Sequence, residues 1–202
     1  MVGNKFKILA ISDNHILKQY SIEQMNFMFK DIDFIISCGD VSYEYLDYVV
    51  SILNKEMLYV NGNHVYGNNE NKKSCGGRNI DGKLIKFRGM KVLGLDGSRV
   101  YSFGKHQYSE NDMKYRVAKL IPKLIFGVDL VISHSPPRGI HDKEDHVHKG
   151  FRVFNDIIRL TSPRLWLHGH IHLRNHTEKQ ESIVGQTKII NVYGYKIIDI
   201  EV

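Results

Sequence analysis

The chain has 202 residues, of which 42% are hydrophobic and 25% charged, and its 28 basic and 22 acidic side chains give a net charge of +6. This composition excludes a disordered or low-complexity chain, and the length predicts one domain, residues 1–202, with a core large enough to need no disulfide framework. This net charge favours an anionic substrate, but it falls short of a nucleic-acid-binding footprint, and the basic residues are dispersed along the chain.

The first sixty residues alternate short apolar runs with amphipathic stretches. The apolar runs are rich in Ile, Val, Leu and Phe, as in buried strands, whereas the stretches between them space their apolar residues as a helix does. The predicted strands are 6–12, 34–37 and 57–60, and the predicted helices are 16–30 and 44–54. This order gives right-handed crossovers, so we expect parallel pairing in an α/β layer.

Beyond residue 60 the pattern changes towards antiparallel strands. A polar stretch rich in Gly and Asn, 61–81, predicts a long loop, and long loops in compact domains are often functional. The elements expected after it are a hairpin of strands 84–87 and 92–95, a helix 110–126 that Pro122 kinks or ends, a strand 129–133, a helix 150–160, a strand 164–167, and antiparallel strands 183–184, 188–192 and 196–200. So many strands predict a four-layer α/β/β/α sandwich of two mixed sheets with helices on both outer faces.

Metal-binding residue types follow the ends of five predicted strands. Taken singly, an Asp in such a place is a typical helix N-cap and a Gly-Asn pair is a typical turn. In an open parallel sheet, however, the carboxyl ends of the strands form one crevice, so five such blocks together predict a single site. The blocks are Asp13 with His15, Asp40, Asn63 with His64, His134, and His170 with His172.

The residue types of these blocks predict a pair of metal ions. Two Asp, one Asn and four His supply oxygen and nitrogen donors without a thiolate, which suits Mn, Fe, Zn, Ni or Co. Seven ligands exceed one tetrahedral site, and two ions that share a carboxylate can clamp an in-line displacement at phosphorus. The predicted chemistry is therefore phosphoester hydrolysis.

The residue spacing inside two of the blocks predicts the direction of their side chains. Asp13 and His15 are one residue apart, as are His170 and His172, so in an extended segment both side chains of a pair point the same way and grip one ion. Three of the blocks are preceded by a glycine, and we expect these glycines to permit tight turns and close backbone approach. The three glycines are Gly39, Gly62 and Gly169.

The ordered motifs resemble those of the calcineurin-like metallophosphoesterase family, which run D-x-H, G-D, G-N-H followed by an acidic residue, H, and G-H-x-H. The segments 134–139, 163–165 and 168–172 are most similar to a small-phosphodiesterase branch of that family, and the resemblance extends from residue 8 to about residue 194. The matching motifs are Asp13-Asn14-His15, Gly39-Asp40, Gly62-Asn63-His64, His134 and Gly169-His170-Ile171-His172.

The resemblance implies a role for each residue of the blocks. Manganese is the expected metal, with Fe, Zn, Ni or Co as alternatives. A hydroxide that bridges two metals would attack phosphorus, and His64 would act in catalysis by protonating the departing alkoxide or steadying the phosphate. In this scheme one divalent ion is held by Asp13, His15 and His172, the other by Asn63, His134 and His170, and Asp40 bridges the two.

One position departs from the family pattern. Val65 follows His64 where the family has an acidic residue, so the side chain that would orient His64 is missing. Asp96, after the strand 92–95, is a candidate substitute, and its alternative role is to begin the Asp96-Gly97 turn. His168, next to the last block, is expected to support the ligands from behind.

The predicted function is metal-dependent hydrolysis of a small phosphoester, most of all a phosphodiester. The alternatives are a nuclease of the same family and a catalytically silent scaffold for protein interactions. Against the nuclease, the chain has no aromatic-basic groove of the sort that holds single strands. Against the scaffold, all seven ligand positions and His64 are intact.

The first strand leaves no room for a signal peptide and no apolar run approaches the roughly 20 residues of a membrane span, so we expect a cytoplasmic protein without a membrane partner. The oligomeric state is left open.

Overall fold

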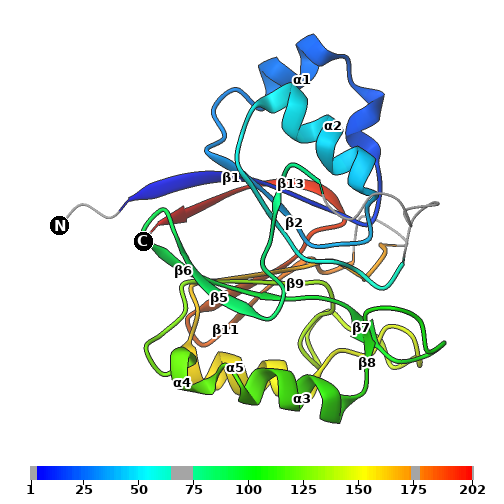
Figure 1. Ribbon diagram of the computed structural model, residues 1–202, viewed down its shortest axis with the longest axis vertical. Coiled ribbons are helices and arrows are strands. Elements are labelled where there is room, and N and C mark those ends of the chain that lie inside the picture. The colour runs from blue at the N-terminus through cyan, green and yellow to red at the C-terminus, as the bar shows by residue number, and fades with distance from the viewer. Residues whose placement is uncertain (1–3, 65–74, 174–177, 202) are drawn as a thin grey trace.

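Two mixed β-sheets lie face to face at the centre of the molecule, and helices cover the outer face of each sheet (Figure 1). The structure is a computed structural model and describes residues 4–64, 75–173 and 178–201. The order of layers is helices, sheet, sheet and helices, as the sequence predicted.

The first sheet has five strands in the order β13-β1-β2-β3-β4. β1 to β4 pair in parallel, as the crossovers predicted, and β13 closes the sheet antiparallel to β1. β4 lies inside the stretch 61–81, which was predicted to be a loop throughout; of that stretch, 65–74 lie outside the described residues. The strands are β1 (Lys5–Ser12), β2 (Phe34–Ser37), β3 (Met57–Tyr59), β4 (Arg78–Asn79) and β13 (Gly194–Glu201).

The second sheet has six strands in the order β11-β12-β10-β9-β6-β5. The four central strands are parallel, and an antiparallel strand, β11 or β5, closes each edge. The last three strands were expected to pair antiparallel; β11 and β12 do so with each other, whereas β13 crosses to the first sheet. The strands are β5 (Lys83–Phe87), β6 (Met90–Leu95), β9 (Leu130–Ser133), β10 (Leu165–His168), β11 (Glu181–Val184) and β12 (Thr187–Asn191), with a separate short pair β7 (Ser98–Arg99) and β8 (Gln107–Tyr108).

Capping serines and a proline mark the starts of four helices. The hydroxyls of Ser21, Ser42 and Ser109 accept N–H bonds at the starts of α1, α2 and α3. The predicted helix 110–126 is two helices, and Pro122 lies in the first turn of the second one, where its missing N–H costs nothing. The helices are the 3-10 helix η1 (Ile16–Gln19), α1 (Ile22–Met28), α2 (Tyr43–Leu53), α3 (Glu110–Ala118), α4 (Ile121–Leu124) and α5 (Arg152–Thr161).

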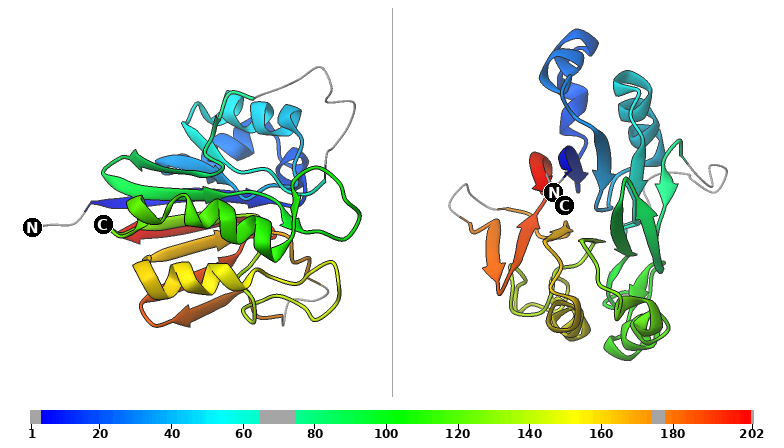
Figure 2. Two further views of the ribbon diagram at one scale, coloured as in Figure 1. Left: turned by 60° about the horizontal axis from the view of Figure 1, so that its bottom comes forward. Right: turned by 90° about the vertical axis from the view of Figure 1, so that its left-hand side faces the viewer.

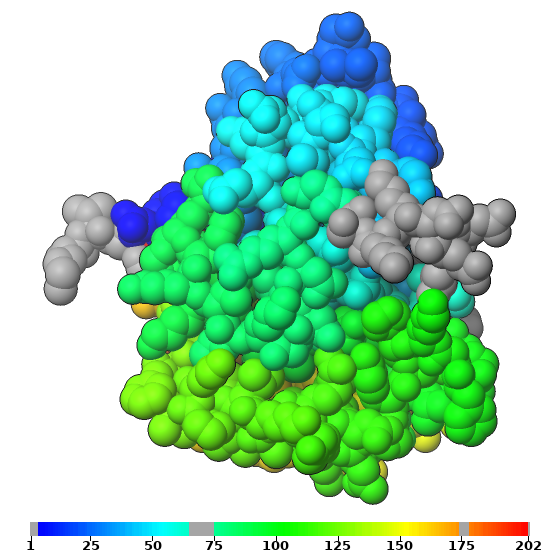
Figure 3. Space-filling view, in the orientation of Figure 1, coloured from blue at the N-terminus to red at the C-terminus, as the bar shows by residue number. Residues whose placement is uncertain are grey.

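Three apolar clusters hold the layers together. One fills the space between the sheets, with Ile36 and Ile132 fully buried in it. A second joins α1 and α2 to the first sheet, and a third joins α3, α4 and α5 to the second sheet around Trp166. On the face seen in Figure 3, the segment from β4 to β6 covers the sandwich between α2 above and α3 and α4 below.

The parallel strands of both sheets end at one edge of the sandwich, on the side away from the two chain termini (Figures 1 and 2). The loops that follow β1, β2, β9 and β10 therefore meet at this edge, and the β7–β8 pair lies at the same end. No helix in the described ranges is long and apolar enough to span a membrane.

Candidate metal centre

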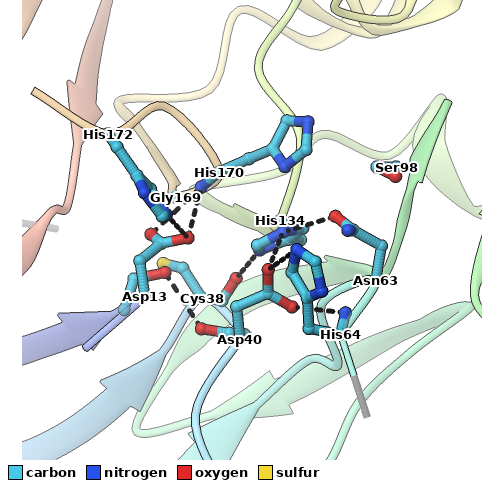
Figure 4. Close-up of polar contacts among 12 residues, drawn as sticks. Asp13, Cys38, Asp40, Asn63, His64, Ser98, His134, Gly169, His170 and His172 are labelled. Atoms are coloured by element: carbon cyan, nitrogen blue, oxygen red, sulfur yellow. Dashed lines mark hydrogen bonds and ion pairs between the residues drawn. The ribbon is translucent and has the colours of Figure 1, made fainter. Parts of the chain in front are cut away.

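Five of the predicted site residues are buried together at this edge, each directly after a strand or close behind one. Asp13 follows β1, Asp40 comes after β2, Asn63 after β3, His134 after β9 and His170 after β10. Their exposed fractions are 6%, 3%, 5%, 0% and 4%. Figure 4 shows their side chains turned towards a common space. The predicted convergence of residues from both halves of the chain is thus present.

The backbone turns sharply at three of these residues, which is different from the extended geometry that we expected. Asp13, Asp40 and His170 have φ values of +65°, +52° and +68°, in the left-handed region. Asp13-x-His15 and His170-x-His172 therefore do not continue their strands. Instead, the two turns interlock, because the backbone N–H of His170 donates to both carboxylate oxygens of Asp13 at 3.0 Å.

Glycine is required where these turns approach one another. A Cβ on Gly62 would lie 1.8 Å from Oδ1 of Asp40, and a Cβ on Gly169 would lie 2.0 Å from Oγ of Ser12. This confirms the close approach predicted for these glycines. The same Asp40 oxygen accepts the backbone N–H of His64 at 2.9 Å, so the segment after Gly62 is fixed to the carboxylate.

The hydrogen bonds of His134 determine which ring nitrogen faces the site. Its Nδ1 lies 2.8 Å from the carbonyl oxygen of Cys38, which can only accept, so Nδ1 carries a hydrogen. Its Nε2 lies 3.1 Å from Oδ1 of Asn63 and 3.2 Å from Oδ2 of Asp40. Nε2 is therefore the donor atom that a metal would meet, and the carbonyl behind the ring fixes its direction.

The ring of His170 carries its hydrogen on the opposite nitrogen from the one that His134 uses to bond its backbone carbonyl. Its Nε2 lies 2.9 Å from the carbonyl oxygen of Val147, so Nε2 carries the hydrogen and Nδ1 keeps a lone pair. Ligand atoms of Asp40, His134 and His170 all lie within 4.8 Å of one another. Among the described residues this is the one compact group of three His, Cys or carboxylate ligands.

The electrostatics of this group favour a cation. Burial raises the pKa of Asp40, but His134 and His64 together outweigh it and lower the value to about 2. Burial lowers the pKa of His134, but Asp40 outweighs it and raises the value to about 9. Burial and His134 lower the pKa of His170 to about 3. The pocket thus draws one positive charge onto Nε2 of His134, and a proton and a metal ion compete for that lone pair. The donor set fits a divalent transition metal.

The other three predicted ligands are brought together in part. Nε2 of His172 lies 3.6 Å from Oδ1 of Asp13, and this contact raises the pKa of His172. Nε2 of His15 instead lies 3.1 Å from the backbone N–H of Ser42, at the start of α2. Burial and Lys18 lower the pKa of His15, so the ring is neutral and accepts this N–H. The described contacts of His15 are therefore with the start of α2.

His64 lies at the open side of the group. Its side chain is 56% exposed, and its Nε2 is 3.9 Å from Oδ2 of Asp40. Val65 lies outside the described residues. The carboxylate of Asp96, the candidate substitute for the acidic residue, contacts His106 at 2.6 Å and Arg116 at 3.1 Å, while Gly97 makes the turn with a φ of +77°. Asp96 thus stabilises the segment that follows it through its contacts with His106 and Arg116.

His168 supports the last motif from beneath. It is fully buried, its Nδ1 donates to the carbonyl of Gly169 at 2.9 Å, and its Nε2 faces Nδ1 of His141 at 2.9 Å. His141 in turn contacts Oγ of Ser182 at 2.9 Å. The sequence indicated the position of His168 but not these partners, and it gave no signal for the carbonyls of Cys38 and Val147, because every residue has a carbonyl.

The fold and the site together define a metal-dependent phosphoric ester hydrolase. A family model described as calcineurin-like phosphoesterase matches residues 6–174. The chain belongs to the calcineurin-like phosphoesterase family. Members of this family depend on a binuclear metal centre. No curated protein sequence matches the chain.

Solved structures share the fold at low sequence identity. One superposes with a TM-score of 0.67 at 17% identity, over 98% of this chain and 99% of that chain. The TT1561 protein of Thermus thermophilus has a TM-score of 0.62 at 15% identity, over 98% of this chain and 99% of that one. The phosphopantetheinyl hydrolase PptH of Mycobacterium tuberculosis has a TM-score of 0.60 at 14% identity, over 95% of this chain and 90% of that one. These similarities establish the architecture.

Proposed function

We propose that the protein is a phosphodiesterase that hydrolyses a small phosphoester at a binuclear metal centre. The observation that carries the proposal is the buried group of Asp40, His134 and His170, whose ligand atoms lie within 4.8 Å of one another. Divalent ions bound here supply charge neutralisation for the phosphate and acidify water near neutral pH. Manganese is the proposed metal, with Fe, Zn, Ni or Co as alternatives, because the donors mix carboxylate and amide oxygen with imidazole nitrogen.

The proposed ligands divide into two sets around Asp40. The first set surrounds Nε2 of His134, where Asn63 offers Oδ1 and His170 offers Nδ1. The second set contains the contact between Asp13 and His172, and its third member, His15, is included because its motif places it beside Asp13. The sets are Asn63, His134 and His170 for one ion and Asp13, His15 and His172 for the other, with Asp40 shared.

His64 is the proposed catalytic residue. Its ring is half exposed beside the Asp40 carboxylate, where a substrate's leaving group reaches it from solvent. A protonated imidazole in that place can donate a hydrogen bond to the ester oxygen and pass its proton to it as the P–O bond breaks. Val65 supplies no carboxylate, and the backbone of His64 is fixed by its N–H bond to Asp40 at 2.9 Å.

The proposed substrate is a small organic phosphoester. The net charge of +6 suits an anion, and the site lies at a loop edge of the sandwich. One structurally similar protein is named as a phosphopantetheinyl hydrolase, which is consistent with phosphoesters of small molecules. We also propose a cytoplasmic location, which suits the two free cysteines Cys38 and Cys75, and a single functional domain.

Hydrolysis of model esters tests the proposal. Bis-p-nitrophenyl phosphate and p-nitrophenyl phosphate are compared with added Mn²⁺, Ni²⁺, Co²⁺ or Zn²⁺, using wild type and the Asp40→Asn variant. We expect the diester to be the better substrate and Asp40→Asn to lose most of its activity. A protein that binds metal stoichiometrically but cleaves neither ester would instead be a scaffold, and cleavage of polynucleotides in preference to both esters would make it a nuclease.

A further inference from the structure

The side-chain amide of Asn63 has two unlike ends, and each end faces a different partner. Its Oδ1 lies 3.1 Å from Nε2 of His134, and its Nδ2 lies 2.9 Å from the hydroxyl oxygen of Tyr101. A rotated amide would present N–H hydrogens to the proposed ligand atoms, where only oxygen can bind a cation, so the site itself fixes this orientation. In the contact with Asn63, the Tyr101 oxygen is therefore the acceptor.

Accepting from Asn63 leaves the hydroxyl hydrogen of Tyr101 to be donated elsewhere. A phenol hydroxyl carries one hydrogen and can both donate and accept. Within the described ranges, the hydroxyl's one hydrogen-bond contact is the one from Asn63, in which it accepts. The half-buried Tyr101 hydroxyl is thus hydrogen-bonded to Asn63, a proposed metal ligand. Because Asn63 donates in this bond, the hydroxyl can act as a donor to another group.

The backbone around Tyr101 is held in place by a side chain from β8. Oε1 of Gln107 accepts the backbone N–H groups of Tyr101 at 3.1 Å and Ser102 at 2.9 Å. Nε2 of Gln107 donates to Oγ of Ser102 at 2.9 Å. The neighbouring N–H of Val100 bonds the carbonyl of Tyr108 at 3.0 Å. These bonds clamp the loop between β7 and β8, and they thereby hold Tyr101 in position beside Asn63.

We propose that Tyr101 is a substrate-binding residue whose hydroxyl donates a hydrogen bond to a phosphoryl oxygen of the ester. The proposal rests on the proposed function, because a phosphoester held beside Asn63 and His134 brings its charged oxygens next to the Tyr101 hydroxyl. A neutral O–H donor to a charged oxygen forms one of the stronger hydrogen bonds in proteins. Tyr101 thus adds recognition of the phosphoryl group without adding charge to the ligand set.

The test is binding of inorganic phosphate to the Mn²⁺-loaded protein by calorimetry, together with KM and kcat for bis-p-nitrophenyl phosphate. Tyr101→Phe keeps the ring and removes only the hydroxyl. Tyr43→Phe is the matched control, because the Tyr43 hydroxyl lies 3.1 Å from Oδ1 of Asn61 in another Tyr-to-Asn hydrogen bond near the site. Gln107→Ala is the second variant, because it releases the clamp and leaves Tyr101 itself unchanged.

We expect Tyr101→Phe to raise the Kd for phosphate and the KM roughly tenfold, the loss of one hydrogen bond to a charged group. Gln107→Ala should raise both in the same direction by less, and Tyr43→Phe should leave both unchanged, with two Mn²⁺ per chain in all variants. Equal phosphate Kd in wild type and Tyr101→Phe, with wild type active, would overturn the Tyr101 proposal alone. A wild type that binds no phosphate and cleaves no ester would overturn it together with the proposed function.

Discussion

Nε2 of His134 lies 3.2 Å from Oδ2 of Asp40, and both side chains are buried. Asp40 comes from the loop after β2 in the first sheet, and His134 comes from the end of β9 in the second. The contact therefore crosses the seam between the two sheets. A carboxylate and an imidazole are placed where a cation can be shared by donors from both halves of the fold.

Asp40→Asn should strongly impair the centre. The change keeps the size of the side chain and removes the charge that attracts a cation, so we expect a loss of metal affinity and a fall in kcat of about 10²–10³-fold. Elemental analysis and bis-p-nitrophenyl phosphate kinetics measure the two effects. Asp156→Asn, at an exposed residue on α5, is the matched control and should change neither. An Asp40→Asn variant with wild-type metal content would contradict the assignment.

His64→Ala should affect esters according to their leaving group. An alkoxide leaving group needs a proton, whereas p-nitrophenolate leaves readily without one, so a general acid matters more for the alkyl ester. We expect kcat to fall by about 10²–10⁴-fold for an alkyl phosphodiester and by less for bis-p-nitrophenyl phosphate, with metal content unchanged. If both esters lost the same factor, His64 would serve binding or structure and not proton transfer.

Gly62→Ala should disrupt the centre, although alanine is small. The added Cβ would lie 1.8 Å from Oδ1 and 2.5 Å from the backbone nitrogen of Asp40, and the latter atom cannot move without the turn. We expect loss of metal binding and a lowered Tm. Gly76→Ala is the control, since its Cβ would make ordinary contacts at 3.6 Å. Wild-type metal affinity in Gly62→Ala would show that the turn has more room than these distances allow.

His106 should stabilise the fold more at low pH than at high pH. Its hydrogen bond to Asp96 raises its pKa above the usual 6.5, against the opposing effect of burial. The stabilisation is therefore complete below the unfolded value and is lost as the pH rises through the raised folded value. We expect His106→Gln to lower the free energy of unfolding by roughly 1 kcal/mol at about pH 6, and by less at about pH 9, in urea titrations. A larger effect at the higher pH would reverse the assigned sign.

The layers of the fold could be predicted because apolar runs mark buried strands directly. β2 and β9 are uninterrupted apolar segments closed by Ser37 and Ser133, and all four residues of each are buried. β4 could not be predicted in the same way, since Arg78 and Asn79 are polar and the strand exists only because β3 offers an edge. The sheet that β13 joins also depends on tertiary pairing with β1.

The convergence of the candidate ligands could be predicted from the sequence, but the geometry of their contacts could not. Asp40 and His134 are visible in the sequence as ligand types after strands, and the structure brings them together. The left-handed turn at Asp13 and the bond from Ser42 to His15 could not be predicted from the residue spacing, because both depend on contacts with backbone that is distant in the sequence. Tyr101 lies in a loop without a motif, so its contact with Asn63 could be found only in three dimensions.

The most direct test of the central claim is anomalous scattering from a crystal grown with Mn²⁺, measured at the manganese edge. The account predicts two ions that both touch Asp40, one also bound by Asn63, His134 and His170, and the other also bound by Asp13, His15 and His172. A map with manganese elsewhere on the protein, and none within coordination distance of Asp40 and His134, would contradict it.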